Sequence, residues 1–399
     1  MSVIFHIDVN SAYLSWTAVE ELKNGKERDL RQIPAIIGGD QKTRHGVVLA
    51  KSIPAKKYGI RTGEPVVNAF RKCPGLVTAP PDHKLYRRYS DRLMEYLQSY
   101  TPVIEQVSVD ECYMDFSQNV KDYHSPVEGA MEIKNEVYRR FGFTVNVGIS
   151  SNKLLAKMAS DFEKPNKVHT LFPEEIQVKM WPLPVAKLYM AGNSSVEVLR
   201  KLGIFTIGEL ARMEPNLLEL HLKSHGRRLW EFANGMGNTV VEPEPGDAKG
   251  IGNSTTLSKD AETEEEAKEV LKMLAASVGR RLRKAGQKAK MLSVEIKYYN
   301  FESASHQKQL GRGTNRDEEI YEEGVLLFRE LWNKNPIRLL GIRSSKLAEE
   351  DEPEQMTIFD PQFQFNPKRE KEKKINQALE KVRIKYVEGI VTRGTKADG

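Results

Sequence analysis

Over the first 170 residues of the chain, segments with the hydrophobic pattern of strands alternate with segments that have the pattern of helices. Residues 3–9 (VIFHIDV) and 144–149 (TVNVGI) are short runs rich in apolar and β-branched residues, which indicates two strands. Residues 86–100 and 127–141 carry apolar side chains at helical spacing, which predicts two helices with one buried face each. With a hairpin between the helices, this order predicts a β-α-β-β-α-β unit, a ferredoxin-like sheet with helices on one face.

The hairpin is residues 105–116 (EQVSVDECYMDF), in which two alternating runs flank the adjacent acids Asp110 and Glu111. We expect two strands that meet at an acidic turn. In a ferredoxin-like sheet the first strand lies beside this hairpin. Asp8, at the end of the first strand, is therefore predicted to lie close to Asp110.

Shorter elements fill the rest of the first 240 residues. Residues 33–50 contain two short apolar strands around a loop, and residues 55–58 (AKKY) suggest one helical turn. Asn152 is placed to cap a helix over residues 153–161. Residues 176–238 carry helical patterns joined by short loops, which is typical of a small helical domain.

A Pro- and Gly-rich segment at residues 242–252 is the clearest boundary in the chain. Beyond it, residues 249–347 have the pattern of two strand-helix pairs and carry 19 Lys and Arg against 14 Asp and Glu. Residues 279–290 hold six cations and no acid. These cations, with the hydroxyl residues Ser254 and Thr255, suit contacts to nucleic-acid phosphates that do not depend on base sequence.

Composition places the chain among soluble globular proteins. Its 399 residues are 39% hydrophobic and 29% charged, with a mean hydropathy of -0.53, and this length suits two to four domains. The N-terminus has no leader pattern and no run of 18 apolar residues occurs, so we expect a cytoplasmic protein without a membrane segment. Cys73 and Cys112 lie in apolar surroundings, as buried free thiols would.

Three carboxylates in one place, Asp8, Asp110 and Glu111, would raise one another's pKa, and burying them requires partners. A divalent cation removes this cost, and oxygen ligands of this kind suit Mg²⁺. Two such ions roughly 4 Å apart hold the attacking and the leaving oxygen of a phosphoryl transfer. The simpler interpretation is a solvated acidic turn, since charged residues are usually exposed.

The segment 348–399 is charged and poor in apolar residues, except at residues 355–359 (QMTIF). A Gln spaced before an Ile-Phe pair in such a segment is typical of a docking peptide.

Together these segments resemble the Y-family DNA polymerases of the DinB/UmuC type. The resemblance rests on HIDVNSAY (6–13), SVDECYMD (108–115), GISSNKLLAKMASDFEKPN (148–166) and a basic domain after a linker. It implies an α+β multidomain, right-hand polymerase with a ferredoxin-like palm, small fingers, a helical thumb and a β-α-β little finger. The expected ranges are 1–12 and 77–166 for the palm, 13–76 for the fingers, 167–240 for a helix-hairpin-helix-like thumb, 241–249 for the linker, 250–347 for the little finger and 348–399 for a tail with a clamp-binding motif at 355–359.

The resemblance also implies roles for single residues. Asp8, Asp110 and Glu111 would be catalytic and bind two Mg²⁺ ions, with Mn²⁺ able to replace them and the carbonyl of Val9 as a further ligand. Tyr13 would be the steric gate that excludes ribonucleotides, although a lone tyrosine is most often a core residue. The other implied contacts are to the incoming nucleotide from Ala12, Tyr13, Lys56 and Lys164, to DNA from Ser254, Thr255, Arg280, Arg281, Arg283, Lys288 and Lys290, and to a sliding clamp from Gln355, Ile358 and Phe359.

The expected function is template-directed, low-fidelity DNA synthesis past lesions, in which a monomer transfers nucleotides from dNTPs to the 3′ hydroxyl of primer-template DNA. One alternative is a palm-type nucleotidyl cyclase, which needs no basic C-terminal domain. Another is a non-catalytic protein that binds DNA and the clamp through a degenerate palm.

One motif departs from the family pattern. Where many members read NYPARKF, this chain has SIPAKKY, with Ile53 and Lys56 in place of Tyr and Arg. Ile53 cannot donate a hydrogen bond, and Lys56 lacks the bidentate fork of Arg. We therefore expect weaker nucleotide binding or an altered base preference.

Overall fold

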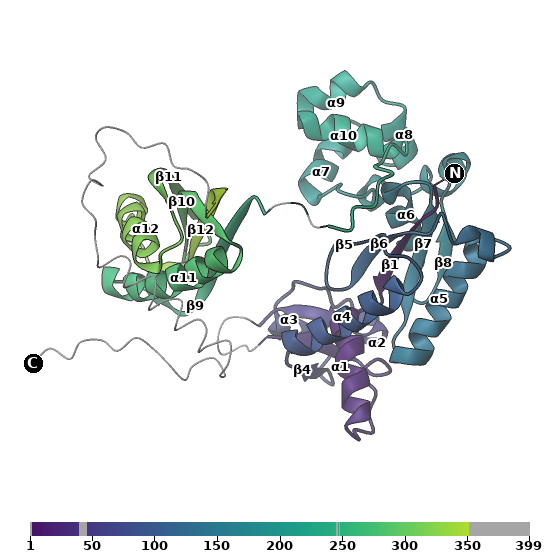
Figure 1. The fold of residues 1–399 in the computed structure, drawn as a ribbon, viewed down its shortest axis with the longest axis horizontal. Coiled ribbons are helices and arrows are strands. Elements are labelled where there is room, and N and C mark those ends of the chain that lie inside the picture. Colours follow the sequence, from purple (N-terminus) through teal and green to yellow (C-terminus); the bar gives the residue numbers. More distant parts are fainter. Residues whose placement is uncertain (1, 40–45, 245, 247, 351–399) are drawn as a thin grey trace, which may run out of the picture.

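The computed structural model describes residues 2–39, 46–244, 246 and 248–350, so the predicted clamp contacts of Gln355, Ile358 and Phe359 lie outside the described residues. Its first sheet has the strand order β5-β6-β1-β7-β8 (Figure 1). β1 lies between β6 and β7 and is antiparallel to both, which confirms the predicted place of the first strand beside the hairpin. The strands are β1 Ile4–Val9, β5 Ile104–Gln106, β6 Glu111–Asp115, β7 Val145–Ser150 and β8 Val168–Thr170.

The acidic hairpin differs in one detail from its pattern. β5 ends at Gln106, and the turn covers residues 107–110. Val107 is exposed and follows the end of β5, so the alternating pattern predicted a longer strand than the one that forms. Glu111 is the first residue of β6, and of the two acids only Asp110 lies in the turn.

Both faces of the first sheet are covered by helices. Alternate side chains of β1 point to opposite faces, so neighbouring residues of this strand contact different helices. Phe5 and Ile7 pack in the core that α4 (His83–Gln98) and α5 (Pro126–Phe141) share with the sheet, as predicted for helices on one face. On the other face, His6 reaches the end of α6 (Lys153–Ser160).

Gly148 in β7 allows α6 to approach the sheet closely. A methyl group on its α-carbon would overlap the carbonyl oxygen of Ala156 and the amide nitrogen of Ser160. Asn152 caps α6 as predicted, because its side chain accepts a hydrogen bond of 2.9 Å from the amide of Leu155. The helix is therefore fixed in direction and in height above the strands.

A three-stranded sheet, β3-β2-β4, and three helices form a second group. The two predicted strands pair antiparallel, and β4 pairs in parallel with β2. The expected palm range 77–166 thus begins inside this second sheet and ends before β8. The elements of this group are α1 Ala12–Lys23, β2 Ala35–Gly38, β3 Val48–Lys51, α2 Ile53–Lys57, α3 Val66–Lys72 and β4 Val77–Ala79.

The helical region predicted over 176–238 packs around a core that includes Leu199, Leu210 and Leu229 and that it shares with α6 through Leu155 and Met158. Helices α7 to α10 lie together at the top of the view in Figure 1. The segment that follows is anchored to the first sheet through Val241, which packs against Ile4. The helices are η3 Pro173–Glu175, η4 Ile176–Met180, η5 Val185–Lys187, α7 Asn193–Lys201, α8 Ile207–Ala211, α9 Pro215–Leu222 and α10 Ser224–Ala233, and the single turn η2 Val120–Asp122 precedes α5.

The C-terminal group is a four-stranded antiparallel sheet, β11-β10-β12-β9, with two helices. The two predicted strand-helix pairs correspond to β9 with α11 and β10 with α12, and the prediction lacks β11 and β12. β11 is largely polar and exposed and so shows no apolar alternation. β12 continues past the expected boundary at 347. The elements are β9 Gly250–Ala261, α11 Glu264–Lys284, β10 Gln287–Tyr298, β11 Ser303–Thr314, α12 Asp317–Leu331 and β12 Ile337–Glu349.

Two expectations about the whole chain can be checked within the described ranges. Cys73 and Cys112 are buried free thiols, as predicted. No helix there combines the length and the apolar character that crossing a membrane requires.

The close approach of α6 gives a stability prediction. Gly148→Ala forces a methyl group against helix backbone that cannot rotate away, so we expect a loss of about 3 kcal/mol or more in the free energy of unfolding, measured by urea titration. Gly75→Ala is the matched control, because no atom lies near its added methyl group and its φ is ordinary. Equal stability of the two variants would show that α6 does not depend on Gly148.

Candidate active site

The strand register brings the three predicted carboxylates to one end of the first sheet. Asp8 lies directly opposite Glu111 in the pairing of β1 with β6. The amide of Val9 donates a 2.9 Å hydrogen bond to the carbonyl of Asp110, which ties the turn to the end of β1. The strand register and this backbone hydrogen bond confirm that Asp8 lies beside the acidic hairpin, as predicted.

Glu111 has cationic and polar partners on the α6 side of the sheet. Its Oε2 lies 2.6 Å from Lys157 Nζ and 3.3 Å from His6 Nε2. The His6 contact is electrostatic rather than a well-formed hydrogen bond, so we regard Lys157 as the stronger partner. His6 and Lys157 together hold the pKa of Glu111 at about 2. Glu111 is therefore ionised at neutral pH.

His6 is buried and joins Glu111 to the end of α6. Its Nδ1 lies 2.8 Å from the hydroxyl of Ser160, and burial lowers the pKa of the imidazole below its usual value. Burial therefore favours the neutral imidazole beside Glu111, and the Ser160 contact fixes the ring at the end of α6.

Asp8 is compensated by a lysine from outside the helix. Lys164 Nζ contacts Asp8 Oδ2 and lies 2.7 Å from Asp161 Oδ1. Burial opposes the charge of Lys164, yet Asp8 and Asp161 raise the pKa of its ammonium group. Lys157 also lies 3.9 Å from Asp161. The charges therefore alternate along a row that runs from Glu111 through Lys157, Asp161 and Lys164 to Asp8.

Asp110 stands apart from this row. Its Oδ1 accepts a 2.5 Å hydrogen bond from the hydroxyl of Ser108, and no cation pairs with it among the described residues. Burial raises the pKa of Asp110, and the charges of Asp8 and Glu111 raise it further. A carboxylate in this position lacks a counter-charge.

The three acids have the donor chemistry of a magnesium site but are not gathered into one. Within the described ranges, no three acidic, histidine or cysteine side chains converge as metal ligands. The reason is that Lys157 holds the carboxylate of Glu111 and Lys164 holds that of Asp8. The missing counter-charge at Asp110 and the oxygen-only donor set fit a hard divalent cation.

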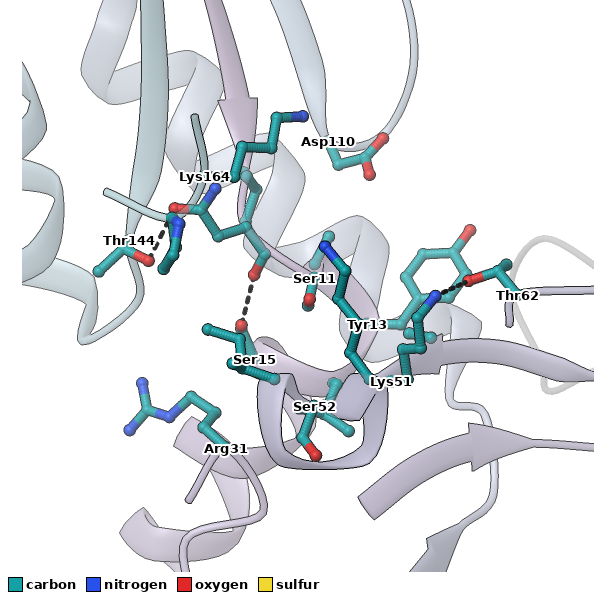
Figure 2. A pocket seen from close by; sticks show the side chains of 18 of the residues that line it. Ser11, Tyr13, Ser15, Arg31, Lys51, Ser52, Thr62, Asp110, Thr144 and Lys164 are labelled. Carbon is teal, nitrogen blue, oxygen red and sulfur yellow. Dashed lines mark hydrogen bonds between the residues drawn. The ribbon is translucent and has the colours of Figure 1, made fainter. Parts of the chain in front are cut away.

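A cleft of about 590 Å³ opens between the end of β1 and the second sheet. Asp8, Val9, Asp110 and Lys164 line it at the end of β1, Ala12 and Tyr13 line it from α1, and Lys51, Ser52, Ile53, Lys56 and Thr62 line it from β3, α2 and the loop that follows. In Figure 2, Asp110 and Lys164 lie at the top of the view, Lys51 and Ser52 in its lower half and Arg31 at lower left. The cleft thus joins predicted catalytic and nucleotide-binding residues.

Tyr13 forms a rigid part of the cleft wall. Its ring stacks on Tyr86 with the centroids 4.3 Å apart and the planes at 7°. His83 meets the same ring edge-on at 6.1 Å. Burial raises the pKa of Tyr13, and nearby Asp110 raises it further. The ring therefore belongs to an aromatic cluster and also borders the carboxylates.

Lys51 and Lys56 are the cations of the opposite wall. Neither forms an ion pair within the part of the chain that the structure describes. Lys51 donates a 3.1 Å hydrogen bond to the hydroxyl of Thr62, as Figure 2 shows. Burial lowers the pKa of Lys51, and the charge of Lys56 lowers it further. Two cations that repel each other in a cleft are suited to an anion.

The predicted DNA contacts do not share one face of the C-terminal sheet. Ser254 lies opposite Gly341, and both line the open face of this sheet. Thr255 lies opposite the buried Leu340, so the alternation of β9 points it toward the helices.

The predicted basic segment is also divided. Arg281 lines the open face and donates a 2.7 Å hydrogen bond to the carbonyl of Gly252. Arg283 instead lies 2.7 Å from Asp317 and binds α11 to α12. The remaining predicted contacts lie at the end of α11 and the start of β10, namely Arg280, Lys288 and Lys290.

Three residues of this region were not singled out from the sequence, although they contact the acids or line the cleft. His6 shares the face of Asp8 because it lies two residues earlier in β1, so strand alternation contained the signal. Lys157 lies in a quoted motif, but only the packing of α6 shows that it reaches Glu111. Lys51 gave no signal, because a lysine at a strand end is usually solvated.

Comparisons with known proteins agree with this geometry. Residues 7–161 match the impB/mucB/samB family, and residues 248–358 match the C-terminal domain of that family. DNA polymerase IV of Clostridium acetobutylicum is 45% identical to this chain over 391 residues, which cover 98% of this chain and 97% of that protein. DNA polymerase IV 1 of Bacillus subtilis is 36% identical, with 98% of this chain and 92% of that protein covered.

A solved structure confirms the fold. The Y-family DNA polymerase chimera Dbh-Dpo4(243-245)-Dbh matches with a TM-score of 0.76 at 23% identity, over 87% of this chain and 99% of that chain. The multidomain α+β fold with palm, fingers, thumb and little finger is therefore present here. The relatives favour neither the cyclase nor the non-catalytic alternative. The chain belongs to the impB/mucB/samB family, the Y-family DNA polymerases of the DinB type.

Proposed function

We propose that this protein is a template-directed, low-fidelity DNA polymerase that extends primers past template lesions. The observation that carries the proposal is the register that sets Asp8 opposite Glu111 and beside Asp110, at a cleft whose other wall is cationic. Primer-template DNA and dNTPs are its substrates. The expected monomeric state and cytoplasmic location belong to the same proposal.

Asp8, Asp110, Glu111 and the carbonyl of Val9 would hold two Mg²⁺ ions, or Mn²⁺ in their place. When bound, these ions supply positive charge to the attacking and leaving oxygens of phosphoryl transfer. Asp110 gains most, because it lacks a cation in the described residues. Lys157 and His6 keep Glu111 ionised and oriented.

The other cleft residues would position the nucleotide. Lys56 and Lys51 attract the triphosphate from the fingers side, and Lys164 binds it from the palm side. The amide of Ala12 begins α1, where the N-terminal end of the helix favours an anion. The ring of Tyr13, fixed by Tyr86, would exclude a ribose 2′ hydroxyl.

The remaining partners bind away from the cleft. Ser254 and Arg281 on the open face of the little finger suit phosphate contacts. Arg280, Lys288 and Lys290 are proposed to add to them, whereas the ion pair of Arg283 with Asp317 suits it better to a structural role. Gln355, Ile358 and Phe359 are proposed to bind a sliding clamp.

The proposed chemistry predicts that Asp110→Asn and Glu111→Gln each lower primer extension by roughly 10²-fold or more, because charge stabilisation in the transition state is lost. Single-turnover extension on an undamaged primer-template measures this. Asp122→Asn, at an exposed acid outside the cleft, is the control. Full extension by either active-site variant would contradict the proposal. Extension past a damaged template base by the unmodified protein is a separate test of lesion bypass.

The steric role of Tyr13 predicts that Tyr13→Ala reduces discrimination between dNTPs and rNTPs by more than about tenfold, or about 1.4 kcal/mol. Ratios of kcat/KM for the two nucleotides give the value. Tyr13→Phe retains the ring and should keep the discrimination. If Tyr13→Ala keeps it too, the ring is only a core residue.

The cationic wall predicts that Lys56→Ala raises the KM for dNTP roughly tenfold with little change in kcat, because a charged contact to bound substrate is lost. Lys57→Ala is the matched control, since Lys57 is exposed on the same helix but does not line the cleft. Equal effects of the two variants would mean that only the total charge of the helix matters.

A further inference from the structure

Two buried asparagines connect the end of β1 to the chain segment that carries Lys164. Asn146 in β7 lies directly opposite Asp8 in the strand pairing, and its side chain is fully buried. Asn10 follows β1 and is nearly as well buried. Neither residue belongs to the proposed chemistry, yet both lie within a few residues of it.

Asn146 binds the backbone of the segment between α6 and β8. Its Nδ2 donates to the carbonyl of Ser160 at 3.0 Å and to that of Glu163 at 2.7 Å. Its Oδ1 accepts from the amide of Lys167 at 3.2 Å. One side chain thus holds both ends of the segment 160–167.

Asn10 completes the attachment. Its Oδ1 accepts from the amide of Asn166 at 2.9 Å and from the hydroxyl of Thr144 at 2.9 Å. Its Nδ2 donates to Asn146 Oδ1 at 3.0 Å. Figure 2 draws the hydrogen bond that Thr144 donates as a dashed line.

The contacts fix the orientation of both amides. Asn146 must turn its nitrogen toward the two carbonyls, so its oxygen faces Asn10. Asn10 must then turn its nitrogen toward that oxygen and its own oxygen toward donors. Each flip would set like groups against each other, and in a buried site an unmet polar group is costly.

We propose that Asn10 and Asn146 are positioning residues whose interlocked side-chain amides hold the segment 160–167 so that Lys164 can serve Asp8 and then the triphosphate. This inference rests on the proposed nucleotide-binding role of Lys164. Lys164 lies in the middle of the held segment, two residues before the amide that Asn10 binds. Asp161, the second partner of Lys164, lies in the same segment.

The proposal predicts non-additive effects of substitution. Asn10→Ala should raise the KM for dNTP about tenfold, as Lys164→Ala does, because a mispositioned ammonium group loses its charged contact. The double variant should be no worse than Lys164→Ala alone. A purely structural role of Asn10 would instead multiply the two effects, and this outcome would overturn the proposal.

A second measurement follows the segment itself. Amide hydrogen exchange of residues 160–167 in the full chain should become faster in Asn10→Ala and in the milder Asn10→Ser. The matched control is Asn234→Ala, which removes amide contacts to the carbonyls of Ala211 and Trp230 in the thumb. The control should leave both the KM and this exchange unchanged. Unchanged exchange in both Asn10 variants would refute the proposal.

Binding of inorganic tripolyphosphate separates this proposal from the proposed function. Calorimetry on the full chain without DNA or metal requires no polymerase activity. We expect weaker binding in both Lys164→Ala and Asn10→Ala. If only Lys164→Ala weakens binding, the positioning role is wrong; if neither does, the nucleotide-binding role of Lys164 is wrong and the inference fails with it.

Discussion

Charge compensation at the end of β1 is the constraint on which the rest of the palm depends. Carboxylates that are partly buried in one place destabilise a fold unless each has a partner. Lys157 meets Glu111, and Lys164 meets Asp8. Among the described residues, the carboxylate of Asp110 is bonded to the hydroxyl of Ser108 and pairs with no cation. Two of the three charges are thus balanced by the chain itself, and Asp110 is the carboxylate at which we propose an added cation.

This compensation requires elements from three places in the sequence. α6 must lie close enough for Lys157 to reach across the sheet, and Gly148 makes that distance possible. The segment after α6 must return toward β1 so that Lys164 reaches Asp8. Asn10 and Asn146 provide the hydrogen bonds for that return. Gly148 in β7 and the hydrogen bonds of Asn10 after β1 therefore both help to place the lysines that balance Glu111 and Asp8.

The sequence predicted the elements with strong periodicity and missed those without it. Four strands of the first sheet, its two covering helices and the place of Asp8 beside the hairpin follow from alternation and topology rules alone, whereas the short edge strand β8 does not. β11 was not predicted because an exposed polar strand has no apolar alternation. β4 was not predicted because a strand of three residues is too short to show a period. The direction of Thr255 and the pairing of Arg283 with Asp317 depend on register and on helix packing, which composition does not contain.

Selection of the nucleotide in the cleft should depend on Lys56, which stands where many family members have an arginine that can make two parallel hydrogen bonds. Lys56 brings charge but only a point contact, and Ile53 brings neither charge nor a donor. Lys51 adds a second cation on the same wall. Two mobile point charges attract an anion at long range but define its orientation less well than one planar guanidinium. The expected weakening of nucleotide binding should therefore fall on the precision of placement more than on attraction.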